Sequence, residues 1–448
     1  MRRFAWRFLA AASLTILAAT AVAELRPRYG GTLVIELHDS LALTDPADWP
    51  VRLVPLVYDC LVRLDEHGEP QPELAISWQH DAANKHWEFR LRPHAAFHDG
   101  TPVTAAAIVA SLTNWKNATA SGESVVIFES EVPAPDLPVR LASPHSAILL
   151  RGADGVSVGT GPFRITEWQA GKHALLSAYE GYWGGRPFVD FVEVLMGRGY
   201  RDQSIDLELG KADLVELPVG TARRAAQQSV RTWTSAPSEL MALVFDRGRV
   251  ATDDARVREA VALSINRAAI QSVLLERQGE STGAVLPAWL SGYAFLFPAA
   301  RNLDRARQLT SALPKAGPHL SLAYDPADPL ARPIAERIAL DARESGIVLQ
   351  AVPGARGDVR LARYRLRSLY APQVLSDVAA WVGVEPSPAA VTPEAIYSTE
   401  RKLLEDFRVV PLFHLPEIYG LSSRVKNWSP QSWGDWRIGD VWLEARKP

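Results

Sequence analysis

Histidines are the first side chains that suggest chemistry, because five of the ten in the chain fall within 32 consecutive residues. These five are His67, His80, His86, His94 and His98. Two histidines four residues apart, such as the last two, would share one face of a helix and could bind a metal ion there. Pro93 and the turn-forming pair Asp99-Gly100 argue against a helix at that place. We therefore expect solvated loop histidines and no metal site.

Acidic pairs are the next candidates, because two neighbouring carboxyl groups can share a proton in acid–base catalysis. The pairs Asp253-Asp254 and Glu405-Asp406 fall at expected helix ends or on exposed helix faces, where adjacent side chains do not face each other. The chain also lacks the H-E-x-x-H and glycine-rich G-K-[ST] motifs of common enzyme sites. We expect no catalytic residues, no cofactor and no enzyme activity.

An arginine-rich segment offers binding rather than catalysis. Residues 363–367 read Arg-Tyr-Arg-Leu-Arg, an alternation that predicts a β-strand with its arginines on one face. Such a row of guanidinium groups in a cleft could bind carboxylate or phosphate groups. The same pattern also fits a solvent-facing strand at a sheet edge. With both readings open, Arg365 and Arg367 are candidate ligand-binding residues, and they favour a ligand with an anionic group.

The elements around these residues indicate an α/β fold. The stretch FHDGTPVTAAAIVASL at residues 97–112 predicts a tight turn followed by a helix that Thr104 caps, so we interpret it as a structural corner. Residues 53–64 predict a helix in which Cys60 is a small buried hydrophobe, and residues 254–277 predict one long amphipathic helix. Further on, a strand at 320–324, a helix at 331–345 and a strand at 347–350 predict a β-α-β unit.

The first 23 residues predict a secretory signal peptide. A positive start with three arginines precedes an apolar run that ends in the small-residue sequence Ala21-Val22-Ala23. Cys60 is the single cysteine, too far from the expected cleavage site to carry a lipid anchor. We therefore expect an unanchored periplasmic protein. Without the three leader arginines, 45 basic residues face 51 acidic ones, a net charge of −6 that argues against a nucleic-acid partner.

Several motifs together resemble the extracellular solute-binding proteins of family 5, the peptide- and nickel-type binding proteins of ABC importers. The similar stretches are Pro72-Glu73-Leu74-Ala75 with Ser77-Trp78, WEFRLR at 87–92, FHDGTPVTA at 97–105, GTGPF at 159–163, YW at 182–183 with Asp190, and VREA at 257–260 with Asn266-Arg267. The likeness runs from about residue 29 to residue 428.

The chain departs from the family pattern where peptide-binding members have a W-x-x-D … D-P segment, whose aspartate holds the ammonium group of the peptide. Residues 364–372 read YRLRSLYAP here, so arginines stand near the place of the acid. The resemblance therefore argues against a peptide with a free amino terminus. It leaves other peptides, opines, sugars, metal chelates and small acids open.

The resemblance implies a periplasmic-binding-protein-like fold of type II, with two α/β lobes of mixed sheets joined by a hinge of two crossings. Lobe one would comprise residues 24–240 plus 412–448, and lobe two residues 245–410. Ser238 and Glu239 would lie at one crossing and His414 at the other. Further cleft candidates by position are Trp49, Trp289, Tyr370 and Trp381, although each tryptophan and tyrosine also fits a hydrophobic core.

The implied function is capture of a small solute between the lobes and its delivery to an ABC permease at the inner membrane. The protein would act as a monomer with a small-molecule or peptide ligand. Two alternatives stay open. The chain could be an orphan binding protein that serves a sensor or acts as a chaperone-like helper, or it could be a secreted hydrolase.

Overall fold

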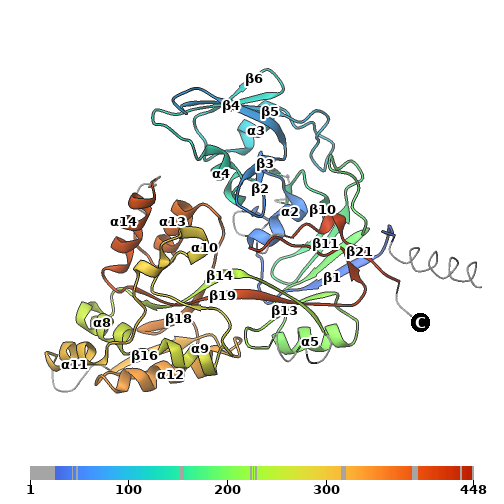
Figure 1. Ribbon diagram of the computed structural model, residues 1–448. Coiled ribbons are helices and arrows are strands. Elements are labelled where there is room, and N and C mark those ends of the chain that lie inside the picture. Colours follow the sequence, from blue (N-terminus) through green and yellow to red (C-terminus); the bar gives the residue numbers. More distant parts are fainter. Residues whose placement is uncertain are drawn as a thin grey trace, which may run out of the picture.

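Two lobes and one shared β-sheet make up the computed structural model (Figure 1). The structure describes residues 26–445 apart from 43, 47–48, 152–155, 222–224, 226, 228–229, 314–318, 386–391 and 434–435. The expected signal peptide, residues 1–23, lies outside the described residues. Within the described part of the chain, no helix is long and apolar enough to cross a membrane.

Within the described residues, the shared sheet has eleven strands and passes through both lobes. Their order is β10 (Phe163–Gln169), β11 (His173–Ala178), β12 (Phe191–Leu195), β1 (Thr32–Glu36), β13 (Leu214–Leu217), β19 (Val409–Leu421), β14 (Arg231–Phe245), β18 (Val359–Arg365), β16 (His319–Tyr324) and β17 (Val348–Pro353), with β15 (Glu280–Ser281) paired to β19. Parallel and antiparallel pairs both occur, so the sheet is mixed. The long strands β14 and β19 connect the lobes and lie side by side across the middle of the molecule (Figure 1).

The pairing of β14 with β19 is irregular where the chain passes between the lobes. The register shifts between Thr234 and Pro237 and again between Pro237 and Glu239, and Pro237 lies opposite Pro416. Proline has no N–H group to donate, so two facing prolines remove ladder hydrogen bonds. A weakened stretch between two regular ladders is a natural place for bending.

Lobe one carries a second, smaller sheet beyond the shared one. That sheet has the order β4 (Ala75–His80), β5 (His86–Leu91), β7 (Val125–Glu129) and β6 (Ala118–Ser121), and packs its own hydrophobic core with α3 (Ala105–Ser111) and α4 (Leu137–Leu141). The remaining elements of this lobe are the strand pairs β2 (Val62–Leu64) with β3 (Pro70–Pro72), β8 (Leu150–Arg151) with β9 (Ser157–Val158) and β20 (Val425–Lys426) with β21 (Trp442–Leu443), the helix α5 (Tyr200–Glu208), and the short helices η2 (Val51–Leu53), α2 (Val54–Val57), η3 (Pro144–Ser146) and η5 (Ile438–Asp440).

Helices cover both faces of the sheet in lobe two. One face packs against α7 (Val250–Asp253), α8 (Ala255–Ser264), α9 (Arg267–Val273), α11 (Leu303–Ser311) and α12 (Ala331–Arg343). The other packs against α10 (Ala288–Ser291), η4 (Ala294–Leu296), α13 (Ala371–Trp381) and α14 (Pro393–Leu404). Strand β16, helix α12 and strand β17 form the predicted β-α-β unit with parallel strands.

The corner at residues 97–112 has the predicted structure except for one histidine. Asp99 accepts a hydrogen bond from the N–H of Thr101, Gly100 has φ +87°, and the Thr104 hydroxyl accepts from the N–H of Ala107. His98 is not a solvated loop residue, because its Nε2 lies 2.9 Å from the carbonyl oxygen of Gly161. Burial lowers the pKa of His98 to about 4.

Two helix predictions are wrong in their extent. The predicted helix 53–64 ends at Val57, because Tyr58 is extended and its hydroxyl donates to the carbonyl of Thr44, and the chain continues into β2. Cys60 is buried, as predicted. The predicted helix 254–277 is two helices, because the Asn266 side chain caps α9 through the N–H of Ala269.

Candidate ligand-binding cleft

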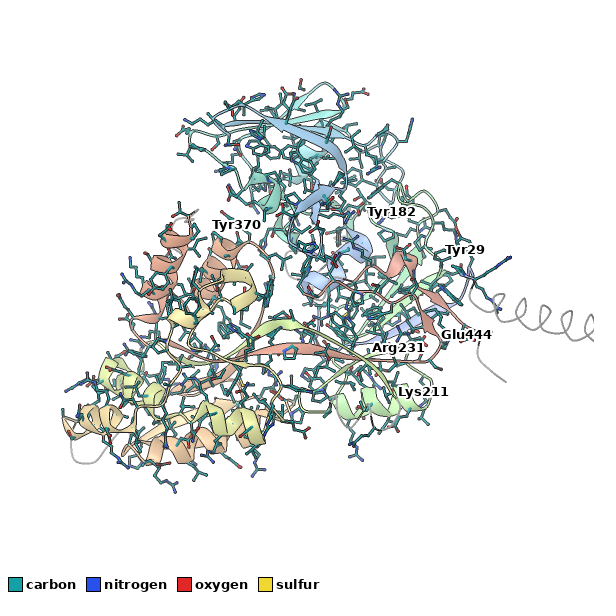
Figure 2. The ribbon with its side chains drawn as sticks, viewed as in Figure 1. Tyr29, Tyr182, Lys211, Arg231, Tyr370 and Glu444 are labelled. Carbon is teal, nitrogen blue, oxygen red and sulfur yellow. The ribbon has the colours of Figure 1, made fainter. Side chains whose placement is uncertain are left out.

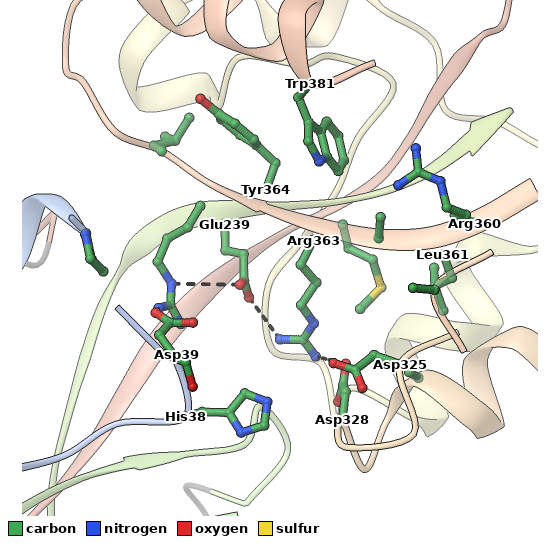
Figure 3. A pocket seen from close by; sticks show the side chains of 18 of the residues that line it. His38, Asp39, Glu239, Asp325, Asp328, Arg360, Leu361, Arg363, Tyr364 and Trp381 are labelled. Atoms are coloured by element: carbon green, nitrogen blue, oxygen red, sulfur yellow. Dashed lines mark hydrogen bonds and ion pairs between the residues drawn. The ribbon is translucent and has the colours of Figure 1, made fainter. Parts of the chain in front are cut away.

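A cleft of about 1020 Å³ lies between the lobes. From lobe one it is lined by the segment that follows β1, which contains His38 and Asp39, and by Tyr200 at the start of α5. From lobe two it is lined by β18, by the loop after β16 and by α13 (Figure 3). The site is therefore assembled from both lobes next to the irregular crossing.

Strand β18 forms one wall of the cleft because its final residues lack a partner on one side. It pairs with β14 along its full length, whereas its pairing with β16 ends at Leu361. Residues 362–365 thus have one edge without a neighbouring strand among the described residues. Alternate side chains point to opposite faces, so Arg363 and Arg365 share one face and Tyr364 lies on the other. Figure 3 shows Tyr364 and Arg363 on opposite sides of the strand.

Arg365 bridges the two lobes through carboxylates. Its guanidinium contacts Asp39 and lies 3.4 Å from Glu216, both in lobe one, and 2.7 Å from Glu417 in β19. Arg52 of lobe one binds the same three carboxylates at 3.3, 2.6 and 3.0 Å respectively. We call these five residues the hinge ion cluster.

Charge in the hinge ion cluster is almost balanced but not fully. Arg52 is 2% exposed and Glu216 4% exposed, so water screens them little. Burial opposes ionisation of Asp39, but Arg365 and Arg52 lower its pKa. Burial raises the pKa of Glu216 despite the same two arginines. The cluster contains three carboxylates and two guanidinium groups, so its acidic groups outnumber its basic groups by one.

Two of the three arginines in the row named from the sequence are ion-paired within the protein. Arg363 lies 2.9 Å from Glu239 and 2.8 Å from Asp328, and Arg365 belongs to the hinge ion cluster. Their positive charges are already neutralised by the protein, so they do not form an open anion site. Arg367 also lines the cleft, is exposed, and has no ion pair within the described residues.

On the other face of β18, an aromatic corner lines the cleft. The rings of Tyr364 and Trp381 lie 5.4 Å apart, with Trp381 on the last turn of α13 (Figure 3). Asp377 lies one turn earlier on the same helix and also lines the cleft. Trp381, named from the sequence, is thus a cleft residue, as is Glu239.

The other residues named from the sequence lie elsewhere. Trp49 is 3% exposed and packs in the core of lobe one against Trp168, with ring centres 5.8 Å apart. His414 is 1% exposed, and its Nε2 lies 2.9 Å from the Val285 carbonyl. Burial lowers the pKa of His414 to about 4. Both fill apolar cores rather than the cleft, because their positions in the chain do not tell which side of the backbone they occupy.

Ser238, Trp289 and Tyr370 lie near the crossing or the lobe interface, outside the main cleft. Ser238 is buried beside a small void that Trp289 also lines, and the indole N–H of Trp289 donates to the Pro237 carbonyl at 2.8 Å. Tyr370 lies at the side of lobe two that faces α4 (Figure 2). Burial raises its pKa, and Asp136 of lobe one raises it further, so the two side chains are close.

Sequence reasoning missed most of the hinge ion cluster. Glu216 and Glu417 sit on strands that pair only in the fold, and Arg52 precedes a short helix, so no spacing connects them. One signal was available, because Asp39 lies three residues after the end of β1, and ligands of α/β proteins often bind beyond the carboxyl ends of strands. Within the described residues, no group of three or more His, Cys, Asp or Glu side chains is placed to hold a metal ion.

The fold and the cleft define a class, the two-lobe type II solute-binding proteins. The chain belongs to one family of that class, "Bacterial extracellular solute-binding proteins, family 5 Middle", which matches residues 69–391. The resemblance seen in the sequence is thereby confirmed, and this family consists of binding proteins rather than enzymes.

Relatives and solved structures agree with this assignment. The nickel-binding periplasmic protein of Escherichia coli is 24% identical over 389 residues, which cover 72% of each chain. The transcriptional regulator SgrR of Photorhabdus laumondii is 34% identical over 163 residues, 32% of this chain and 29% of the regulator. The periplasmic binding protein DppA from Helicobacter pylori, solved with a peptide, superimposes with a TM-score of 0.80 at 17% identity, covering 94% of this chain and 99% of DppA. NikA from Staphylococcus aureus, solved with Ni(L-His)2, gives 0.78 at 18% identity over 92% of this chain and 100% of NikA.

Proposed function

We propose that this protein is the substrate-binding component of an ABC importer, which captures a small solute in the cleft and delivers it to an inner-membrane permease. Family membership and relatives named as periplasmic binding proteins support this role. The leader at residues 1–23 supports a periplasmic location, and we propose that the mature protein works as an unanchored monomer without a cofactor or enzyme activity.

The observation that carries the proposal is a cleft with walls from both lobes beside an irregular crossing. A bend at the crossing would change the distance between the walls, so a solute that touches both walls favours the closed arrangement. A permease can then distinguish the loaded protein from the empty one by its shape.

The cleft also limits the kind of solute. Its volume of about 1020 Å³ suits a molecule of the size of an amino-acid derivative or short peptide. Its lining carries both signs of charge next to the rings of Tyr364 and Trp381. This mixture replaces the anionic preference inferred from the arginine row.

Native mass spectrometry of the mature protein tests the proposal, followed by identification of any molecule released on denaturation. We expect one stoichiometric small molecule. A thermal-shift screen with peptides, sugars, amino acids and small acids complements this, since a ligand at 100 times its Kd stabilises a protein by about 2.7 kcal/mol. An empty protein whose melting no compound shifts would contradict the proposed function.

A second candidate function is presentation of the solute to a sensor instead of a permease. It is favoured by the 34% identity to part of a transcriptional regulator. Uptake of the labelled solute by cells separates the two. Loss of uptake in a deletion strain supports transport, whereas unchanged uptake with altered transcription supports the sensor role.

A further inference from the structure

The loop between β18 and α13 reaches from lobe two onto lobe one. It comprises residues 366–370, which read Leu-Arg-Ser-Leu-Tyr, and we call it the strap. Leu366 and Arg367 line the cleft. Ser368 and Leu369 line a second cavity of about 360 Å³, and all its other lining residues among those described belong to lobe one. Within this short segment the chain thus passes from the wall of the cleft to the surface of the other lobe.

The middle of the strap is buried where the lobes meet. Ser368 is 2% exposed, and Val51 and Arg52 of lobe one line the small void beside it. Its hydroxyl oxygen accepts a hydrogen bond from the backbone N–H of Tyr370 at 3.0 Å, which gives the strap a fixed turn. Serine is mostly exposed on folded proteins, so its burial here indicates close packing of the strap against lobe one.

The end of the strap contacts lobe one through a polar pair. Burial raises the pKa of Tyr370, and a side-chain hydrogen bond with Asp136 raises it further. Asp136 directly precedes α4 of lobe one, and its side chain makes no capping hydrogen bond to that helix. The carboxylate can therefore accept a hydrogen bond from the Tyr370 hydroxyl without any loss to α4.

Helix α13 connects the strap to the cleft. The helix begins at Ala371 with Pro372 in its first turn, where the fixed φ of proline favours helical structure. Further along the same helix, Asp377 and Trp381 line the cleft. Because a packed helix moves largely as one body, detachment of the strap from lobe one would also move this wall of the cleft.

We propose that the strap holds lobe two on lobe one even in the solute-free protein, so that the lobes separate only after the strap detaches. The inference goes beyond the proposed function, because it assigns the control of access to the cleft to one loop. The strap follows directly after Arg365, whose ion pairs belong to the hinge ion cluster, and gives the lobes a second attachment of a different kind.

Thiol labelling measures detachment of the strap, because a buried thiol reacts only when it becomes exposed. Cys60 is the single native cysteine, so Cys60→Ser provides a background without other thiols. Ser368→Cys in this background places a thiol at the buried centre of the strap. In the absence of solute, we expect N-ethylmaleimide to label it at least about a hundredfold more slowly than Ser398→Cys, an exposed position on α14.

Removal of the polar pair should accelerate the labelling of Ser368→Cys. Tyr370→Phe and Asp136→Ala should each do so by about three- to tenfold, the effect of one hydrogen bond on the equilibrium of detachment. The combined variant should react no faster than the faster single variant, because both substitutions remove the same bond. Leu369→Ala should also accelerate the labelling, because it removes apolar contact with the cavity of lobe one.

Two controls separate detachment of the strap from general unfolding. Ser264→Cys places a thiol at a position of lobe two that is 0% exposed, and Tyr370→Phe should leave its labelling unchanged. Tyr179→Phe removes a tyrosine hydrogen bond within lobe one, to the carbonyl of Phe97 at 3.1 Å. It should leave the labelling of Ser368→Cys unchanged.

Three results would overturn the inference. They are protection of Ser368→Cys below about a hundredfold, acceleration below about threefold in Tyr370→Phe and Asp136→Ala, and effects of these two substitutions that multiply in the combined variant. The labelling needs no solute, so it is independent of the proposed function. If native mass spectrometry finds no solute while the strap behaves as expected, the proposed function alone fails.

Discussion

The buried guanidinium group of Arg52 contacts all three carboxylates of the hinge ion cluster. It is 2% exposed and reaches residues from β13, from β19 and from the segment after β1. Removing one partner from a buried ionic group leaves the others uncompensated, which costs more than the group contributes net.

Replacing Arg52 by methionine should therefore lower the free energy of unfolding by about 3–5 kcal/mol, measured by urea denaturation. Arg332→Met is the control, because Arg332 is 70% exposed in an ion pair with Glu336, and it should lose less than about 1 kcal/mol. Similar losses in the two variants would mean that the carboxylates around Arg52 protonate or reach water.

The burial of His414 predicts how the free energy of unfolding depends on pH. Its pKa is about 4 in the folded protein, below the ordinary value of 6.5, because burial disfavours the charged ring. Between pH 6.5 and pH 4 the unfolded chain binds the proton more readily, so acidification favours unfolding by about 1.4 kcal/mol per pH unit in that window.

The variant His414→Gln should lose less stability than the wild type between pH 6.5 and pH 4, measured as unfolding free energies at several pH values. The comparison with the wild type cancels the opposite effect of Asp59 and Glu400, whose pKa values burial raises to about 6 and about 7. Parallel curves for variant and wild type would show that folding does not change the pKa of His414.

At the scale of elements, the glycines before β10 determine how closely lobe one packs. A Cβ atom on Gly159 would lie 1.9 Å from the carbonyl oxygen of Val57, at the end of α2. The contact involves backbone, so no side-chain rotation relieves it. The sequence showed the GTGPF motif but not its neighbour, because the two segments are about a hundred residues apart.

Gly159→Ala should consequently destabilise the protein by at least about 2 kcal/mol in thermal or urea unfolding. Gly199→Ala serves as the control, since Gly199 has φ −63° and the nearest atom to its Cβ would be 3.6 Å away. Its effect should stay within about 0.5 kcal/mol. Equal effects would show that α2 moves freely away from the motif.

The sequence predicted elements well where the signal was local. The cap by Thr104, the turn at Asp99-Gly100 and the β-α-β unit of lobe two depend on neighbours in the chain, and all three are present. The helix predicted at residues 53–64 failed because a tertiary hydrogen bond of Tyr58 and pairing with β3 outweigh helical periodicity.

The site was less predictable than the elements, because it also depends on contacts between residues that are distant in the chain. Trp381, Glu239, Arg365 and Arg367, named from the sequence, line the cleft. The ion-pair partners of these side chains could not be predicted from the sequence, since the partners of Arg365 come from three distant segments. The sequence therefore suggested an open anion site where the structure has neutralised arginines.

At the scale of the whole molecule, Arg365 holds lobe two against lobe one. Arg365→Gln would remove the ion pairs between lobe two and the carboxylates of Asp39, Glu216 and Glu417, so the lobes should separate more readily. We expect a larger radius of gyration in small-angle X-ray scattering of the ligand-free protein, with a smaller difference from the wild type at high salt because ions weaken the ion pairs of the wild type.

Arg360→Gln controls for the loss of an arginine, because Arg360 pairs with Asp246 within lobe two. Its radius of gyration should equal that of the wild type. An unchanged radius for Arg365→Gln would show that the crossing strands, and not the ion pairs, set the distance between the lobes.

The position of β19 also bears on how the protein is made. This strand comprises residues 409–421, near the end of the chain, yet it lies in the middle of the sheet between β13 and β14. Synthesis proceeds from the amino terminus at about 5–20 residues per second, so both halves of the sheet must wait for their central strand. A nascent chain that stops before residue 409 cannot complete either lobe. Late folding of this kind keeps the chain in a state that an export channel can thread, and it makes any truncation that removes β19 a threat to the entire fold.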